Sequence, residues 1–566
     1  MRTALGLLVF LSVAAGCNLK LTTGEGGGGE GGGGDGGSDP GACQGVPTTG
    51  ECVDDSTIRS CVVPDASEQA VQPKIVEVTC SELEKCEIGI NGAECKLQGD
   101  CYPGETRCLD ASTLQSCQND ATWASSPCGG DSCIAQPGLG AQCLSSSGGT
   151  GINLRGHLRY EFLTRNSNLT DIGDTRLEED GVDFFVTVYK YTDETFTEAK
   201  LLGQGLTGAG VNNAPGVWSL ELSEPIDDKT FVYFWPMLFD QSGLPRMAMA
   251  RAENGDAISQ FSTAYWVWGF PTCAEGTGEC GTEDLGTQLI DIESGSGAAN
   301  IYRWMDYGIF RFEDLYPGAD NLTFAIFWEP GNDYNCGNCF VPPAGGGAEV
   351  LFDAANNQSD HFASSINISG SGESPTMWAE SVIGHEFGHW VMQSYTKSPG
   401  EGGVHFVDAA SAPGLSYSEG FATFTGQAML SNSPSDNEPI YFTKKSGTTF
   451  WVDISQNTWS GGALELPNPN GPVDQDINEN VVASMFWSFW ASGNAPAPQS
   501  MGDAPVYNTF REGRLLNNEV WNRGYHTVDM VDYLDALSCS GNASSAQINA
   551  VADSVDYPWD GNANCP

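Results

Sequence analysis

The sequence predicts a multidomain protein with two small disulfide-rich modules, a β-sandwich domain and a larger α+β domain. Three observations lead to this prediction. The chain has 566 residues, which is too long for one ordinary domain. Its cysteines are concentrated between residues 43 and 143, where their spacing repeats. Beyond them, strand-like segments give way to a mixture of helix-like and strand-like segments from about residue 297.

Residues 1–17 have the features of an export signal. Arg2 supplies a positive charge, and Ala4–Val13 is an apolar stretch too short to span a bilayer. The following Ala14–Cys17 resembles a bacterial lipobox, in which the cysteine becomes the lipid-bearing N-terminus. We therefore expect an exported protein, lipid-anchored through Cys17 to the bacterial outer membrane or cell surface. An ordinary signal peptide and a secreted protein are the alternative.

Residues 18–42 are expected to form a disordered tether. Between Gly24 and Gly37 the chain is glycine interrupted only by acidic residues, so it has no apolar side chains to bury.

Two consecutive modules, residues 43–97 and 98–145, each contain six cysteines. The stretch Cys52–Cys61 closely matches Cys108–Cys117, which marks a repeat. Each module is too short for a large apolar core, so we expect three disulfides in each. Six cysteines can pair in 15 ways, and their spacing does not choose among them. The modules are expected to act as spacers, and any ligand they bind is left open.

Residues 152–272 are predicted to form the β-sandwich domain. Strand-like segments separated by Gly, Asn and Asp clusters occur at Leu154–Leu163, Val182–Tyr191, Val217–Leu222, Thr230–Leu238 and Arg246–Ala252. No chemistry-bearing motif occurs there, and removal of this region as a pro-segment is left open.

Residues 273–566 are predicted to form the α+β domain. Helix-like segments occur at Ala298–Tyr307, Val481–Ala491 and Val528–Leu537. The remaining cysteines are expected to form three local or terminal disulfides, namely Cys273–Cys280, Cys336–Cys339 and Cys539–Cys565.

The stretch Val382–Met392 contains a candidate metal site. His385 and His389 are four residues apart, so on a helix both imidazoles project from one face, a turn apart. This spacing allows both rings to bind one Zn²⁺, and Glu386 is placed to take a proton from a water on the metal. The alternative is a buried helix with two core histidines.

Two imidazoles leave such a site incomplete, because a catalytic zinc normally takes three protein ligands and one water. We expect Glu419 to be the third ligand. Ser418 suits a helix N-cap, which would put Glu419 in the first turn of a second helix. Asp408 and His405, in a less regular stretch, are the alternatives.

These residues carry a resemblance to a known family. HEFGH at His385–His389, followed by SEGFA at Ser418–Ala422, resembles the gluzincin zinc metallopeptidases of the thermolysin and fungalysin type. The resemblance covers roughly residues 300–566. It implies a zincin-like metallopeptidase domain across 273–566, with Glu419 as the third zinc ligand.

A later segment extends the resemblance and also departs from it. Asn480–Trp487 resembles the next helix of fungalysin-like proteins, some of which carry a histidine just before it. This chain has Asp476 and its neighbours there and no histidine, so the usual donor to the oxyanion of the transition state is missing. His526, Tyr525 and Tyr417 are candidates for that donor.

The predicted function is a zinc metalloendopeptidase, at the cell surface or secreted. His385, His389 and Glu419 would hold the metal, and Glu386 would act as the general base. A catalytically inactive surface adhesin or binding lipoprotein with a protease-like fold is the alternative. Protein or peptide is the expected substrate, but the sequence does not reveal which one.

The net charge of the chain limits the classes of partner that it can bind, and it suggests that the protein binds calcium in addition to zinc. With 24 basic and 73 acidic residues the formal net charge is −49, which excludes nucleic acid and anionic membrane surfaces as partners. Contact with a membrane is therefore expected only through the lipid anchor. So many surface carboxylates would suit structural Ca²⁺ in an extracellular medium. We expect a monomer.

Overall fold

The computed structural model describes residue 46 and residues 50–565, except for 63–73, 81–82, 90–91, 102–105, 137–139, 145–151, 194–198, 209–213, 241–242, 252–264, 274–279, 281–282, 318–321, 335, 344–347, 354–357, 402–404, 406, 408, 513–514, 517–526 and 564. The predicted signal peptide (1–17), lipidation of Cys17 and tether (18–42) lie outside these residues. In the described part, no helix is both long enough and apolar enough to cross a bilayer.

Each cysteine-rich repeat folds into a three-stranded sheet and a two-stranded hairpin. In the first repeat the strands are β1 (Glu51–Asp54), β2 (Thr57–Val62), β3 (Lys74–Thr79), β4 (Glu84–Gly89) and β5 (Gly92–Leu97). In the second they are β6 (Thr106–Asp110), β7 (Thr113–Cys117), β8 (Trp123–Pro127), β9 (Ser132–Gln136) and β10 (Gly140–Leu144). The matching strand order shows that the repeat in sequence is also a repeat in structure.

Disulfides hold both repeats, as predicted, and they select one of the possible pairings. Cys101–Cys117, Cys108–Cys133 and Cys128–Cys143 join the second repeat. In the first repeat, Cys52–Cys86 and Cys80–Cys95 occupy the matching positions, and Cys61 is also disulfide-bonded. The predicted pairs Cys273–Cys280, Cys336–Cys339 and Cys539–Cys565 are confirmed as well.

Two four-stranded sheets follow the repeats. The first has the order β12-β11-β15, with β20 paired to β11; its strands are β11 (Asn153–Phe162), β12 (Leu177–Asp180), β15 (Val217–Glu221) and β20 (Asp284–Ile290). The second has the order β14-β13-β16-β19, formed by β13 (Phe185–Tyr191), β14 (Ala199–Leu206), β16 (Thr230–Trp235) and β19 (Trp268–Pro271). All five strand-like segments expected between residues 152 and 272 are strands.

A five-stranded sheet with the order β17-β18-β21-β25-β22 lies beside the helices. Its strands are β17 (Met237–Phe239), β18 (Pro245–Ala250), β21 (Phe324–Phe327), β22 (Cys339–Val341) and β25 (Ser364–Asn367). Smaller sheets are formed by β23 (Ala348–Asp353) with β24 (Gln358–Phe362), and by β26 (Ile440–Lys445), β27 (Thr448–Asp453), β28 (Thr458–Trp459) and β29 (Gly462–Ala463).

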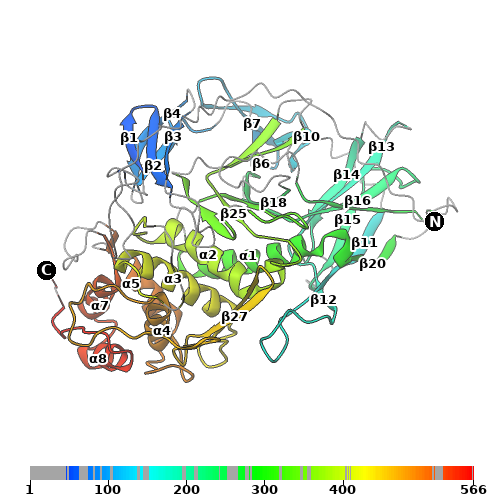
Figure 1. Cartoon of the computed structure of the whole chain (residues 1–566). Helices are drawn as coiled ribbons and strands as arrows, with labels where there is room; N and C mark the ends of the chain where they lie inside the picture. The colour runs from blue at the N-terminus through cyan, green and yellow to red at the C-terminus, as the bar shows by residue number, and fades with distance from the viewer. Residues whose placement is uncertain are drawn as a thin grey trace, which may run out of the picture.

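The helices carry much of the core. They are α1 (Ser296–Leu315), α2 (Glu380–Tyr395), α3 (Pro413–Leu430), α4 (Glu479–Trp490), α5 (Asp503–Phe510), α7 (Met530–Cys539) and α8 (Ser545–Ser554), with short 3₁₀ turns at η2 (Ile292–Ser294) and η4 (Thr376–Trp378). Figure 1 shows α1, α2 and α3 side by side in the middle of the molecule. The strands β11 to β16 lie at one end, and α4, α5, α7 and α8 gather at the other (Figure 1).

The predicted fold class is wrong. The described residues form many small sheets, antiparallel except for the β11–β20, β18–β21 and β21–β25 pairings, and not a β-sandwich followed by an α+β zincin-like domain. Strands from the expected sandwich pair with strands beyond it, and one buried apolar cluster runs from Leu154 to Trp559. Alternating polarity identifies a strand but does not identify its partner. The residue limits of the individual domains stay predictions.

Candidate metal centre

The centre is built where α2 and α3 approach each other at backbone distance. A Cβ on Gly384 would lie 2.8 Å from the Cα of Gly426, and one on Gly388 would lie 2.7 Å from the Cα of Ala422. Residues without a side chain therefore let the two helices touch. The pairs 384–426 and 388–422 run in opposite directions along the chain, so the helices are antiparallel.

This contact brings together the three side chains that the sequence proposed as metal ligands. The Nε2 atoms of His385 and His389 lie 3.1 Å apart, and they lie 3.2 and 3.3 Å from Oε2 of Glu419. Zinc bonds of about 2.0–2.1 Å in tetrahedral geometry imply ligand-to-ligand distances of roughly 3.3 Å. The three atoms therefore fit one zinc ion, and they form the only such cluster of His, Cys, Asp and Glu atoms among the described residues.

Glu419 reaches this position from a different place in its helix than expected. The N-cap of α3 is Ala412, with Pro413 in the first turn, so the helix starts before Ser418. The expected N-cap at Ser418 is wrong, because a proline at the start of a helix is at least as good a signal as a serine. Glu419 consequently lies in the second turn of α3, on a rigid part of the element.

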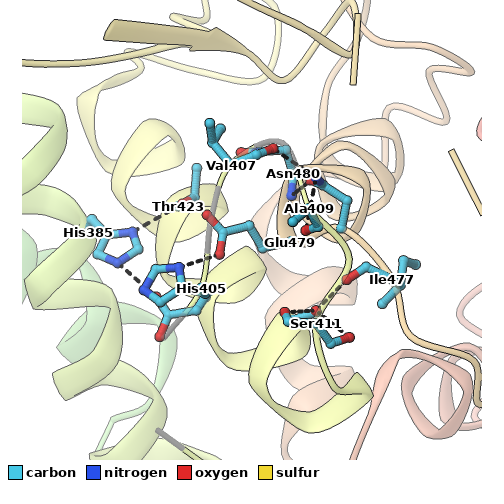
Figure 2. Close-up of polar contacts among 12 residues, drawn as sticks. His385, His405, Val407, Ala409, Ser411, Thr423, Ile477, Glu479 and Asn480 are labelled. Carbon is cyan, nitrogen blue, oxygen red and sulfur yellow. Dashed lines mark hydrogen bonds and ion pairs between the residues drawn. The ribbon is translucent and has the colours of Figure 1, made fainter. Parts of the chain in front are cut away.

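Hydrogen bonding orients the first histidine. Nδ1 of His385 lies 3.0 Å from Oγ1 of Thr423, which comes from the turn of α3 that follows Glu419 (Figure 2). A partner on Nδ1 leaves Nε2 directed at the other ligand atoms, and such partners commonly fix the orientation of metal-binding histidines. Thr423 is a contributor that the sequence did not single out.

Electrostatics favour an ionised carboxylate at the centre. Burial alone would raise the pKa of Glu419, but His405 and His389, with hydrogen bonds from His385 and His389, hold it well below its usual range. Burial opposes the charged form of His389, yet Glu419 raises the pKa of that ring. An anionic oxygen facing two imidazoles is the donor set that a divalent transition metal prefers.

Glu386 is buried in the same part of α2. Its side chain is 5% exposed, and its charge contributes to the raised pKa of His389. A buried carboxylate beside the ligand atoms is where a general base would be needed.

A second pair of residues lies next to the ligands. Nε2 of His405 is 3.7 Å from Oε2 of Glu419. On the other side of the ring, Nδ1 of His405 is 2.5 Å from Oε2 of Glu479 (Figure 2). Glu479 is the first residue of α4. The sequence proposed His405 only as an alternative ligand and gave Glu479 no role.

Two asparagines of α4 hold the segment that follows His405. The side-chain amide of Asn478 donates to the carbonyls of Val407 and Ala409. That of Asn480 donates to the carbonyl of Val407 (Figure 2). Asn478 is also the N-cap of α4. The signal that could have located this contact is Asn478-Glu479, a capping residue followed by a first-turn acid.

Of the other residues considered, Tyr417 and Asp476 are the ones that the structure describes. Asp408, Tyr525 and His526 lie outside the described residues. Tyr417 is 1% exposed, and its ring packs against Phe486 with ring centroids 5.8 Å apart, so it belongs to the core. Asp476 is exposed to solvent.

No protein-family model matches the chain, and no curated protein matches its sequence. The function is therefore inferred from the geometry of the site.

Proposed function

We propose that the protein is a zinc-dependent peptidase that hydrolyses peptide bonds with an activated water. The observation that supports this proposal is the spacing of the His385, His389 and Glu419 ligand atoms, 3.1–3.3 Å apart, with Glu386 buried beside them. Zinc held there would supply a Lewis acid for the scissile carbonyl and would lower the pKa of a bound water.

Glu386 is the proton carrier of the proposed reaction. Its carboxylate takes a proton from the attacking water and then passes it to the amine that leaves. Burial suits this role, because a carboxylate removed from bulk water binds a proton more readily than an exposed one.

His405 is the proposed donor to the oxyanion. Glu479 accepts a hydrogen bond from Nδ1 of His405, and its carboxylate stabilises the doubly protonated ring, in which Nε2 also carries a proton that it can donate. That nitrogen lies beside Glu419, where a substrate carbonyl bound near the metal would develop negative charge. His405 thus takes the role for which the sequence offered His526, Tyr525 and Tyr417.

The test uses the full chain. Purified protein should contain close to one zinc per chain by elemental analysis and should cleave casein, and a chelator should abolish the cleavage. Glu419→Ala should lose most of its zinc because one of three ligands is gone. Full zinc in Glu419→Ala would overturn the ligand assignment. Zinc binding without hydrolysis of any protein substrate would favour the alternative, an inactive binding lipoprotein. Export and lipid attachment at Cys17 stay predictions.

A further inference from the structure

A cavity of about 280 Å³ lies at the end of the α2–α3 pair opposite to Glu419. It is bordered by the start of α2, the end of α3 and the loop that follows α3. Its walls include three aromatic and four charged residues, namely Trp304, Trp378, Phe442, Arg165, Glu380, Asp436 and Glu438.

Glu380 is the unusual group in this cavity. No described residue donates a hydrogen bond to its carboxylate or forms an ion pair with it. Burial raises the pKa of Glu380 to about 7, while Arg165 opposes the change and Glu179 and Glu438 add to it. The guanidinium of Arg165 is engaged elsewhere, 2.8 Å from Oε1 of Glu438 and 2.9 Å from the carbonyl of Ile440. A carboxylate thus faces the cavity without a counter-ion of its own.

The other walls also favour positive charge. Indole and phenyl rings attract cations through their faces, and three aromatic residues line this cavity. Leu430 and Ser431, at the C-terminal end of α3, line it too, and that end of a helix carries partial negative charge. The cavity wall contains three acidic side chains, Glu380, Asp436 and Glu438, but only one basic side chain among the described residues, Arg165. The complementary ligand is an ammonium or a guanidinium group.

The cavity shares two elements with the metal centre. Ser381 lines the cavity four residues before His385, so both lie on one face of α2, a turn apart. On β26, Phe442 lines the cavity, and the ring of the adjacent Tyr441 is 5.9 Å from the ring of His385. We propose that this cavity receives a lysine or arginine side chain of the polypeptide that is cleaved at the metal centre. This inference rests on the proposed function.

The experiment measures binding of Nα-acetylarginine amide to the full chain, by calorimetry or saturation-transfer NMR. Wild-type protein should bind this probe at millimolar concentration, and the neutral citrulline analogue should bind at least tenfold more weakly. Glu380→Gln should weaken binding of the arginine probe at least tenfold. The matched control is Glu373→Gln, an exposed glutamate just before the same helix, which should bind like wild type.

Equal binding of arginine and citrulline probes, or wild-type affinity in Glu380→Gln, would overturn the inference. The glutamine variant should fold, because it replaces a buried charge by a neutral group of the same shape. If circular dichroism shows that it does not, Trp304→Leu serves instead and should weaken the arginine probe more than tenfold. Unchanged binding in that variant would count against the cavity.

Metal-free protein should bind the probe as well, so this measurement does not depend on catalysis. Absence of zinc with intact probe binding would defeat the proposed function alone, whereas hydrolysis without probe binding would defeat the cavity alone. A peptide library should then show a preference for Lys or Arg near the cleaved bond, and Glu380→Gln should reduce it at least tenfold. A library profile without that preference would overturn the link to the substrate.

Discussion

At the scale of single residues, a substitution at Glu386 distinguishes the catalytic role of the centre from its ability to bind metal. Glu386→Gln removes the proton acceptor and leaves His385, His389 and Glu419 in place. We expect unchanged zinc content and a loss of kcat of at least about 10², the usual contribution of a general base. Elemental analysis and peptide hydrolysis measure the two properties. Hydrolysis near the wild-type rate would remove Glu386 from the mechanism.

His405 and Glu479 form the second pair to be tested. His405→Gln should lower kcat by about 10²–10³ with little change in KM, because an oxyanion donor acts mainly in the transition state. Glu479→Gln should lower kcat less, since the imidazole keeps its place but loses its anionic partner. Zinc content should not change in either variant.

Asp476→Asn is the matched control for Glu479, as an exposed acid just before the same helix. It should behave like wild type. Loss of zinc in His405→Gln would instead make His405 a metal ligand.

Asp306 is a buried acid away from the metal centre, and it allows the effect of a buried charge on the stability of the fold to be measured. Its side chain is fully buried, neither carboxylate oxygen has a hydrogen bond to a described residue, and Arg303 lies 3.7 Å away. Burial, with Asp183 adding and Arg303 opposing, raises its pKa from 3.8 to about 8. The unfolded chain therefore loses the proton near pH 4 and the native chain near pH 8, so stability falls as the pH rises between these values.

Asp306→Asn does not titrate and should escape this fall. We expect the free energy of unfolding of the variant minus that of wild type to be a few kcal/mol larger at pH 9 than at pH 5, since one pKa unit corresponds to about 1.4 kcal/mol. Urea unfolding of both proteins at the two pH values measures the difference. The same difference in stability at both pH values would show that Asp306 ionises normally.

The sequence predicted part of the centre at this scale. His385, Glu386 and His389 share one helical turn, so their spacing alone brings them together. Glu419 was expected from an assumed helix start at Ser418 and from the family resemblance, and the assumed helix start was wrong. The contact of His405 with Glu479 joins residues separated by 74 positions, and no periodic pattern reports such a contact.

At the scale of elements, the metal centre depends on how closely α2 and α3 pack. Gly388→Ala would put a methyl group 2.7 Å from backbone atoms of Ala422, so the helices must separate. We expect a loss of about 1–3 kcal/mol in the free energy of unfolding, typical of overpacking, and a zinc affinity at least tenfold lower. Competition with a chromophoric chelator measures the affinity.

Gly372→Ala is the control for this prediction. A Cβ at that position meets no atom of the described part of the chain within 4 Å, so stability and zinc affinity should both be unchanged. Equal effects of the two substitutions would show that the close approach of the helices does not govern the site.

The sequence predicted which segments are helices or strands better than it predicted the residues at which they begin and end. The helix-like segments expected at 298–307, 481–491 and 528–537 are confirmed within or near α1, α4 and α7. The start of α3 was placed too late because Ser418 was taken as the N-cap, whereas the helix begins at Pro413.

At the scale of the whole molecule, charge dominates. A formal net charge of −49 destabilises the compact state by self-repulsion, and salt screens this repulsion. We expect Tm to rise by about 2 °C or more between 20 and 300 mM NaCl, which corresponds to roughly 2 kcal/mol for a chain of this length. Differential scanning calorimetry measures it, and a flat or falling Tm would contradict the prediction.

Calcium is separated from simple screening by matching the ionic strength. If CaCl₂ raises Tm more than NaCl does at equal ionic strength, the predicted structural calcium exists. If Tm rises equally in the two salts, screening of charge repulsion accounts for the whole increase.

The global arrangement was the least predictable level. The expected sandwich failed because Met247 on β18 pairs with Phe324 on β21, across a region where the sequence changes character. Such pairings depend on which apolar faces pack against each other in the fold. A single sequence shows which faces are apolar but does not show which of them pack together.

The pairing of β11 with β20 also has a consequence for how the protein is made. Arg155 and Asp284, which are hydrogen-bonded across this pair, are 129 residues apart in the chain. At a synthesis rate of about 5–20 residues per second, β11 leaves the ribosome roughly 6–25 s before its neighbour. During that interval one edge of β11 is open to pairing with other chains. The length of this exposure is set by translation, so slower synthesis would favour aggregation, and a chaperone that covers residues 153–162 would prevent it.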